Sequence, residues 1–167
     1  GLGEHCIPID PFYLSWKAKL SGFEARFIEL AGQINGSMPE FVVHKISAAL
    51  NRFKKSVNGS RILILGISYK ENIADMRESP ALDVMRLLKA RGADVVFYDS
   101  LVEGVTDELG ADALIELTAQ EVAACDCAAI ITGHRNVDYQ LVLDNIPVLV
   151  DTRNVLKGFR SDKIIKL

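Results

Sequence analysis

The sequence predicts an α/β fold in which a parallel sheet follows a helical segment. From residue 61 onward, short apolar runs alternate with stretches of helical periodicity, whereas residues 1–58 show a loop and helical patterns without a strand pattern. Strands that alternate with helices form a parallel sheet through right-handed crossovers. We therefore expect a Rossmann-like parallel-sheet domain over residues 59–167, preceded by a short helical segment over residues 1–58.

The first part of the helical segment is predicted from a cap and from apolar periodicity. A helix is expected over about residues 11–20, with Asp10 as its N-cap. Apolar residues at helical spacing over residues 27–34 indicate a second helix with one apolar face. Asn35-Gly36 is expected to end that helix, because both residues favour turns.

A separate third helix is expected to follow. Ser37 and Glu40 have the spacing of a capping box, in which each side chain satisfies a free backbone N–H of the first turn. Asn58-Gly59 marks the stop. The apolar stripe of this helix consists of Val42, Ile46, Ala49, Leu50 and Phe53.

Four strands are expected in the second part. The run from Arg61 to Gly66 is almost continuously apolar, which is typical of a strand buried on both faces. The other three are expected over residues 93–98, 128–132 and 147–150. Helices are expected between them over residues 80–92, 118–124 and 137–145.

Composition excludes several classes of partner. The net charge of -3 argues against nucleic acid and against an anionic membrane, because both favour a basic face. No apolar run is long enough to span a bilayer, and the start has no signal-peptide pattern. Three cysteines, an odd number, predict a cytoplasmic protein without a disulfide framework. The start at Gly1 inside a loop predicts a fragment of a longer protein.

A complete dinucleotide site is not expected in this chain. Such a site has the pattern G-x-G-x-x-G after the first strand, and this chain instead continues Gly66-Ile67-Ser68-Tyr69-Lys70-Glu71. Asp99 ends the second strand, where a ribose-binding acid would lie. Without the glycines, a turn residue at a strand end is the preferred interpretation of Asp99.

The loop after the first strand carries an unusual set of side chains. Tyr69, Lys70 and Arg77 precede the start of a helix at Pro80. An aromatic ring, two cations and a helix N-terminus suit a nucleotide with phosphates. The simpler interpretation is a solvated polar loop, because charged loops are common.

The cysteines allow two interpretations each. Cys6 lies in a loop rich in glycine and proline, with His5 and Asp10 nearby, and is either a nucleophile or a structural thiol. Cys125-Asp126-Cys127 with His134 does not have the spacing of a standard zinc site. Packing in the core, and no metal site, is expected for that segment.

Four motifs cover nearly the whole chain and give it a family resemblance. In order, the sequence resembles the UDP-glucose/GDP-mannose dehydrogenase family in its catalytic-cysteine loop, its central helical segment, the start of its C-terminal domain and its final loop. These motifs are residues 3–14, 26–43, 66–80 and 151–154. The run around Cys6 is most similar to the bacterial branch that acts on UDP-N-acetylglucosamine. Glu4 departs from the family, which generally has a glycine there.

The resemblance implies a reaction and two catalytic residues. Members of the family oxidise the sugar C6 alcohol to a carboxylate with two NAD, in polysaccharide biosynthesis. Cys6 would add to the C6 aldehyde as a thiohemiacetal and then carry a thioester. Asp10 would assist the water that hydrolyses this thioester.

The resemblance also implies partners. Tyr69, Lys70 and Arg153 would bind the UDP-sugar, and Arg77 would reach toward NAD bound by a domain that this chain lacks. The helical segment would form a homodimer, with its apolar stripes paired across a two-fold axis. The alternative is a non-redox nucleotide-binding or dimerisation module. A loop with a cysteine and an aspartate favours the enzyme, because a binding module has no need for it.

Overall fold

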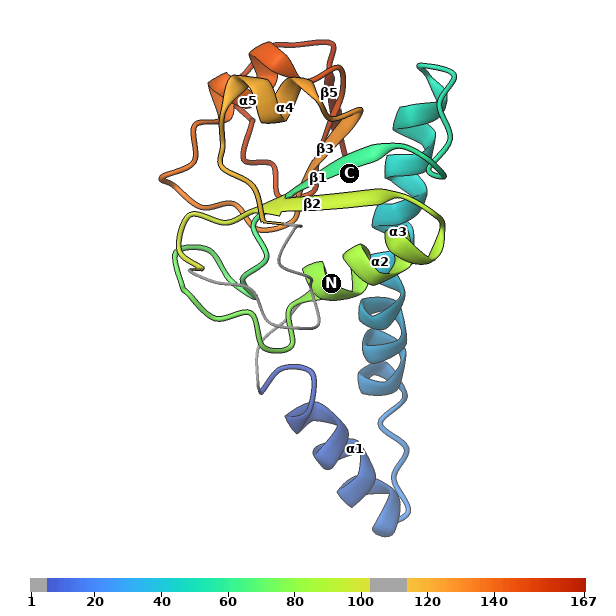
Figure 1. The fold of residues 1–167 in the computed structure, drawn as a ribbon. Coiled ribbons are helices and arrows are strands. Elements are labelled where there is room, and N and C mark those ends of the chain that lie inside the picture. Colours follow the sequence, from blue (N-terminus) through green and yellow to red (C-terminus); the bar gives the residue numbers. More distant parts are fainter. Residues whose placement is uncertain (1–5, 103–113) are drawn as a thin grey trace.

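A five-stranded parallel sheet forms the centre of the molecule (Figure 1). The computed structural model describes residues 6–102 and 114–167. The strands follow the order β2-β1-β3-β4-β5, and β1 pairs with β2 from Arg61 opposite Asp94 to Leu65 opposite Tyr98. Their bounds are Arg61–Leu65 (β1), Asp94–Tyr98 (β2), Cys127–Ile130 (β3), Leu149–Asp151 (β4) and Ile164–Lys166 (β5). The α/β prediction is confirmed, and β5 is an additional edge strand.

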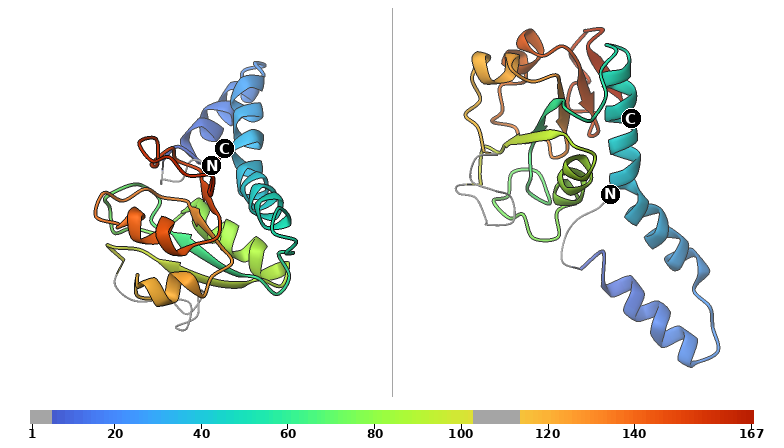
Figure 2. Two further views of the ribbon diagram at one scale, coloured as in Figure 1. Left: turned by 90° about the horizontal axis from the view of Figure 1, so that it is seen from above. Right: turned by 45° about the vertical axis from the view of Figure 1, so that its right-hand side comes forward.

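Helices cover both faces of this sheet, as the view from above also shows (Figure 2). Along β1, Ile62 and Ile64 pack in one apolar cluster, and Leu63 and Leu65 pack in the other. This alternation is the two-residue period of a strand that is buried on both sides. One face is covered by α2 (Arg26–Asn51) and α3 (Pro80–Ala90), and the other by α4 (Ala119–Ala123) and α5 (Tyr139–Asn145).

Three helices of the domain begin at side-chain caps. The Ser79 hydroxyl accepts a hydrogen bond from the Ala81 N–H at the start of α3. Thr118 caps α4 and Asp138 caps α5 in the same way. Each cap satisfies one backbone N–H that the first turn of a helix leaves without a partner. The predicted positions of these helices are confirmed to within two residues at their starts.

The second and third predicted helices are one continuous helix, so the expected break at Asn35-Gly36 is wrong. α2 runs through both residues and through Pro39. The Ser37 hydroxyl does not cap a new helix but donates to the Ile34 carbonyl at 2.8 Å, inside the helix. Buried residues hold the second half of α2 against the sheet, and the helix continues from there through Asn35-Gly36 without a break.

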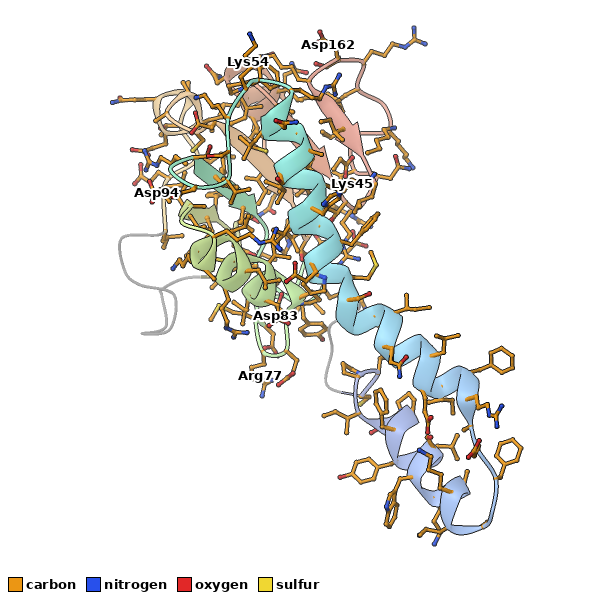
Figure 3. All side chains as sticks on the ribbon, turned by 90° about the vertical axis from the view of Figure 1, so that its right-hand side faces the viewer. Lys45, Lys54, Arg77, Asp83, Asp94 and Asp162 are labelled. Carbon is orange, nitrogen blue, oxygen red and sulfur yellow. The ribbon has the colours of Figure 1, made fainter. Side chains whose placement is uncertain are left out.

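A helical arm, residues 10–38, extends from the domain (Figure 3). It consists of α1 (Asp10–Leu20) and the first half of α2. Ile9 is the N-cap of α1, so the predicted cap Asp10 lies instead within the first turn. A Cβ at Gly32 would lie 2.1 Å from the Phe12 ring, so glycine allows the two helices to approach. The Ser15 hydroxyl donates to Glu29 across them at 3.0 Å.

Apolar side chains of the arm lie on the surface. Phe27 is 88% exposed, and Leu30 and Ile34 are about half exposed. Val42 and Ile46, which belonged to the predicted dimer stripes, are instead buried against the sheet of their own chain. Of the predicted dimer stripes, Phe27, Leu30, Ile34 and Phe53 therefore remain at the surface. Among the described residues, no helix is long and apolar enough to cross a membrane.

The segment with two cysteines packs in the core, as predicted. Cys125 and Cys127 are free, buried thiols. Burial raises the pKa of Cys125 to about 11 and that of Cys127 to about 12. Both thiols are therefore protonated at neutral pH and act as small apolar side chains. His134 is fully buried as well, but it lies beyond the end of β3 with polar neighbours.

Candidate functional site

The loops at the carboxyl ends of β1, β2 and β3 meet at the point where the strand order reverses. β1 lies between β2 and β3, so the chain leaves β1 toward one side of the sheet and later crosses to the other. Open parallel sheets bind ligands at this switch point. Here three loops come together, at residues 66–79, 99–102 and 132–136.

The switch point itself is closed. Gly66 has a φ of +81°, and a Cβ at this position would lie 2.1 Å from the Thr132 carbonyl oxygen. Ser68 and His134 have no exposed surface, and Asp99 is 5% exposed. α3 begins only at Pro80, far along the loop. The described residues of this edge therefore do not fit a dinucleotide, whose pyrophosphate needs an open glycine turn next to a helix start.

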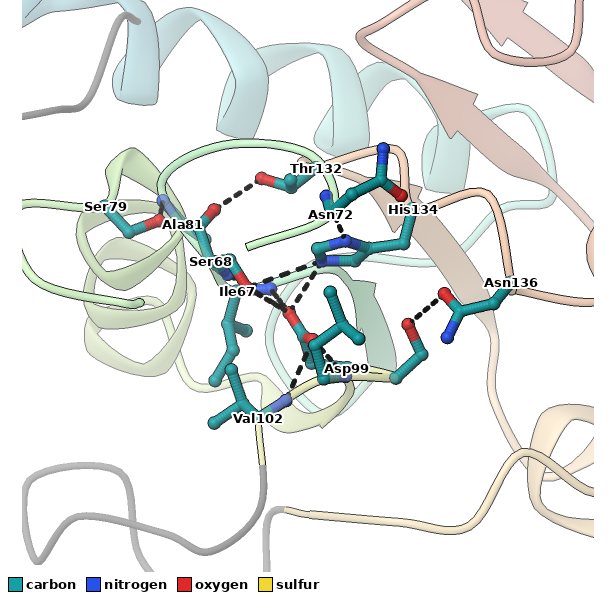
Figure 4. A network of polar contacts seen from close by, with 12 residues as sticks. Ile67, Ser68, Asn72, Ser79, Ala81, Asp99, Val102, Thr132, His134 and Asn136 are labelled. Atoms are coloured by element: carbon teal, nitrogen blue, oxygen red, sulfur yellow. Dashed lines mark hydrogen bonds and ion pairs between the residues drawn. The ribbon is translucent and has the colours of Figure 1, made fainter. Parts of the chain in front are cut away.

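Asp99 organises the closed switch point (Figure 4). Its Oδ1 accepts the N–H groups of Leu101 and Val102, which confirms the interpretation as a turn residue at a strand end. Its Oδ2 accepts four further donors, which the sequence did not predict. These are the Ile67 N–H at 2.8 Å, the Ser68 N–H at 3.1 Å, the Ser68 hydroxyl at 3.0 Å and His134 Nε2 at 3.0 Å.

The donors keep this buried carboxylate charged. Burial on its own would raise the pKa of Asp99. The hydrogen bonds from His134 and from the Leu101 and Ile67 N–H groups have the larger combined effect and hold the pKa of Asp99 well below its usual range. Asp99 is therefore a fixed negative charge at neutral pH.

The predicted nucleotide loop is anchored to this network. The Tyr69 N–H donates to the Asp75 carbonyl at 2.8 Å, which closes residues 69–75 into a turn. At its far side the Asn72 N–H donates to His134 Nδ1 at 3.0 Å, and Asn72 Oδ1 accepts the Arg135 N–H at 3.1 Å. Lys70 lies in this turn with an exposed side chain. The loop is thus held in a defined conformation, although most of its side chains are exposed to solvent.

Arg77 extends into solvent from the same loop (Figure 3). Its guanidinium forms a two-pronged pair with the Asp75 carboxylate, with Nε 3.1 Å from Oδ1 and a terminal nitrogen 2.7 Å from Oδ2. This hydrogen bond to Asp75 raises the pKa of Arg77. The predicted contact of Arg77 with a cofactor stays a prediction.

Arg153 lies at the same edge of the sheet, in the loop after β4. Asp151 shapes this loop, because its buried carboxylate accepts the N–H groups of Arg153, Val155 and Leu156. Arg153 Nε donates to the Ile131 carbonyl at 2.7 Å. The residue is exposed overall, yet the packing around its guanidinium lowers the pKa of that group.

A pocket of about 250 Å³ adjoins Arg153. Pro39 of α2 lines it, and so does Pro80 at the start of α3. The pocket therefore places a guanidinium and a helix N-terminus at one cavity. Both favour negatively charged groups of a ligand.

Cys6 and Asp10 lie at the start of the helical arm. The Cys6 carbonyl accepts the Ile9 N–H at 3.0 Å and the Asp10 N–H at 2.8 Å, so Asp10 follows Cys6 by one turn of the chain. Cys6 is exposed, which is not the buried structural thiol of the alternative interpretation. Figures 1 and 2 both show α1 beginning on the side of the domain where the loop of residues 66–79 lies. His5 and Glu4 lie outside the described residues.

Comparisons with known sequences give the chain a family. The model of the "UDP-glucose/GDP-mannose dehydrogenase family, UDP binding domain" matches residues 63–158. A UDP-N-acetyl-D-mannosamine dehydrogenase of Methanococcus maripaludis is 30% identical over 94% of this chain and 36% of its own length. A UDP-N-acetyl-D-glucosamine 6-dehydrogenase of Pseudomonas aeruginosa is 33% identical over 60% of this chain and 24% of its own length.

Solved structures agree with this result. A UDP-D-ManNAc dehydrogenase from Pyrococcus horikoshii has a TM-score of 0.81 and 27% identity, over 99% of this chain and 38% of that one. The chain thus spans little more than a third of the length of such relatives. The family model matches more than half of the 167 residues, and so this chain belongs to the UDP-glucose/GDP-mannose dehydrogenase family.

Proposed function

We propose that this chain is the C-terminal part of an NAD-dependent UDP-sugar 6-dehydrogenase and that its substrate is UDP-N-acetylglucosamine. The observation that supports this most is the match of residues 63–158 to a UDP-binding domain. Within that stretch, the loops with Lys70 and Arg153 follow two parallel strands and therefore lie at one edge of the sheet. Its cysteine loop supplies the chemistry that a pure binding module lacks.

Lys70 and Arg153 bind the diphosphate in this proposal. Two cations neutralise a charge that water would otherwise solvate, and a guanidinium forms paired hydrogen bonds to phosphate oxygens. Tyr69 offers its ring to the nucleoside beside Lys70. The pocket at Arg153 has the mixed apolar and cationic lining that a nucleotide needs.

Cys6 is the nucleophile of the second oxidation. When the sugar C6 has become an aldehyde, the Cys6 sulfur adds to its carbonyl carbon, and the carbonyl oxygen takes up a proton. This thiohemiacetal has an sp³ carbon with a hydrogen that a hydride acceptor can remove. Its oxidation leaves a thioester on Cys6, and a thioester is easily hydrolysed.

Asp10 assists this hydrolysis. It follows Cys6 by one turn and is exposed, so water reaches it. As a carboxylate it accepts a proton from the attacking water while the oxygen bonds to the thioester carbon. The thiol of Cys6 then leaves, and the product is a carboxylate at C6.

NAD supplies the acceptor for the two hydrides in the complete enzyme. The closed switch point of this chain does not fit it, so its site belongs to a part of the enzyme outside this sequence. Arg77 extends from the loop that carries Lys70, and its side chain would contact the NAD.

The sugar is the finer part of the proposal. Relatives named for UDP-N-acetyl-D-mannosamine and for UDP-N-acetyl-D-glucosamine both match the chain. These sugars are epimers at C2, so both carry the N-acetyl group and the same reacting C6. We choose UDP-N-acetylglucosamine because the sequence around Cys6 is most similar to the branch of the family that acts on it.

A homodimer through the helical arm completes the proposal. The arm exposes many large apolar side chains, and an exposed apolar patch of this kind is typical of a protein–protein interface. They include Tyr13, Leu14, Trp16, Phe23 and Phe27. A second copy of the arm would cover them.

The cytoplasmic location also stays a prediction.

The decisive experiment compares the 167-residue chain with the full-length enzyme. The chain should bind UDP in calorimetry but form no NADH. The full-length enzyme should form two NADH for each UDP-N-acetylglucosamine that it oxidises. It should form NADH more slowly with UDP-N-acetylmannosamine. NADH formation by the chain alone would contradict the proposal. UDP binding without turnover by the full-length protein would favour the non-redox binding module.

A further inference from the structure

A buried aspartate–histidine pair lies beneath the loop that carries Lys70 (Figure 4). The side chains of Asp99 and His134 have 0% exposure and lie 3.0 Å apart. Neither can touch a substrate, and the reaction proposed above does not use them. The pair joins three segments that are distant in the sequence, namely the loops after β1, β2 and β3.

The contacts of His134 indicate which of its two ring nitrogens carries the proton. The Asn72 N–H can only donate, so the Nδ1 atom 3.0 Å away must carry a lone pair. The proton of the neutral ring is then on Nε2, which donates to Asp99 Oδ2. Asp99 thereby selects the tautomer, and this tautomer presents an acceptor to Asn72.

Two anchors hold the chain on either side of Lys70. Ser68 is the first: Asp99 accepts its N–H and hydroxyl, and its carbonyl accepts the Thr132 hydroxyl at 2.7 Å. Asn72 is the second, through His134. Lys70 lies midway between these anchors in the chain. Its backbone position therefore depends on both.

The second anchor holds an uncommon backbone conformation. Asn72 has a φ of +60°, in the left-handed region that asparagine adopts more readily than other residues with a Cβ. Such a conformation persists only where surrounding contacts determine it. The Arg135 N–H contacts the Asn72 side chain, whereas His134 holds its backbone.

We propose that His134 is a positioning residue for nucleotide binding, which fixes the loop of Lys70 through the Asn72 N–H in the conformation that receives the diphosphate. This inference rests on the proposed UDP site. A variant that frees the loop should populate the binding conformation only in part, and the apparent affinity falls by that fraction.

The first test is calorimetry of UDP binding to the chain. His134→Leu removes both ring contacts and should weaken UDP about ten-fold. His134→Gln retains an acceptor and a donor and should recover most of the affinity. Tyr139→Phe is the control, because it removes a buried hydroxyl that contacts the His134 carbonyl but not the loop. Equal affinity of His134→Leu and wild type, or equal losses in the leucine and phenylalanine variants, would overturn the inference.

The second test is a double-mutant cycle with Lys70→Ala. If His134 acts through the position of Lys70, then His134→Leu should cost much less affinity once Lys70 is gone. A general loss of structure would give the same fold-change in both backgrounds. Additive effects would therefore reject the positioning role.

Hydrogen exchange separates this inference from the proposed function. Without ligand, amides of residues 69–75 should exchange faster in His134→Leu while those of β1 and β3 stay protected. If the leucine variant does not fold, the pair Asn72→Gly and Asn72→Ala replaces it. Glycine tolerates the positive φ and should bind UDP about as wild type does, whereas alanine should bind about five-fold more weakly. Unchanged loop exchange in all variants overturns the positioning itself, whereas absent UDP binding by the wild type overturns the nucleotide site.

Discussion

The two halves of α2 have the same apolar periodicity and opposite surroundings. In the second half, Val43, Ile46 and Leu50 have no exposed surface, because the sheet and α3 cover them. In the first half, Phe27 and Leu30 are 88% and 50% exposed. Periodicity thus identifies the apolar face of a helix but not what covers it. The apolar face of the second half packs within this chain, whereas that of the first half is exposed on the arm.

The same division separates binding from chemistry in the proposed enzyme. The loop of Lys70 is fixed by buried groups of the domain, and the loop of Arg153 is shaped by the buried Asp151. Cys6, the proposed nucleophile, is exposed at the start of the arm. We therefore expect nucleotide binding to survive in this chain alone and catalysis to be lost.

The largest effect is expected at the arm, in the full-length enzyme. Cys6→Ala removes the nucleophile that turns the aldehyde into an oxidisable adduct. Acid formation should stop, with at most one NADH per sugar instead of two. The measurement is NADH formed per sugar consumed. A ratio near two in the alanine variant would reject the catalytic role of Cys6.

Asp10→Asn provides the matched variant. The nucleophile remains, but hydrolysis of the thioester loses its base. An acyl-enzyme should accumulate and be visible as an added mass on the intact protein. Full turnover without such an adduct would assign the water-activating role to another group.

The next effect tests the two halves of α2 directly. Ile46→Ala leaves a cavity in the core and should lower the free energy of unfolding by about 2–4 kcal/mol. Leu30→Ala shortens a half-exposed side chain of the same helix and should change the free energy of unfolding of the monomer only slightly. Urea unfolding of both variants gives the comparison. Equal losses at a concentration that excludes dimers would show that the arm is covered within the chain.

The dimer can be tested on the arm by charge. Phe27→Asp places a carboxylate on the most exposed of the large apolar side chains of the described residues. If the arms pair, sedimentation at micromolar concentration should change from dimer to monomer, with the domain still folded. A wild-type chain that sediments only as a monomer would contradict the proposed pairing.

Lys70 should show a smaller but clear effect within the domain. Lys70→Ala removes a charge-assisted contact to phosphate, worth about 1.5–3 kcal/mol, or about ten-fold or more in UDP affinity. Lys17→Ala removes the same charge from the arm and serves as the control. Equal affinities in calorimetry for the two variants would move the nucleotide site away from the Lys70 loop.

Much of the fold could be predicted because its signals are local. The strand at β1 is one continuous apolar run, and the starts of α3, α4 and α5 carry capping residues. β5 was missed because it is short and only half-buried, so it has no strong apolar pattern. The predicted break in α2 was wrong, because the helix that is packed over residues 42–50 continues through the turn sequence.

The candidate site could be predicted only in part, for a related reason. The site residues themselves came from the family motifs, whereas the contact between Asn72 and His134 joins positions 62 apart. No local pattern announces such a contact. The position of His134 just after a predicted strand was the one available signal, and it also fits simple core packing.

The smallest effect is expected from the charges of the arm, with the domain as reference. Hydrogen bonds from Lys19 and Ser15 lower the pKa of Glu29, which lies at the surface, whereas that of Asp99 is lowered inside the core. A carboxylate with a lowered pKa stabilises the fold above its ordinary pKa, about 3.9 for aspartate and 4.3 for glutamate, and loses this contribution as the pH falls. Asp99→Asn should therefore be less stable than wild type at pH 7, and the gap should narrow below about pH 4. Glu29→Gln should show only a slight gap at pH 7 that disappears in about 1 M salt, because water and ions screen an exposed pair. Urea unfolding across this pH range measures both, and a gap at Glu29 as large and as salt-resistant as that at Asp99 would mean that the arm is buried against another surface.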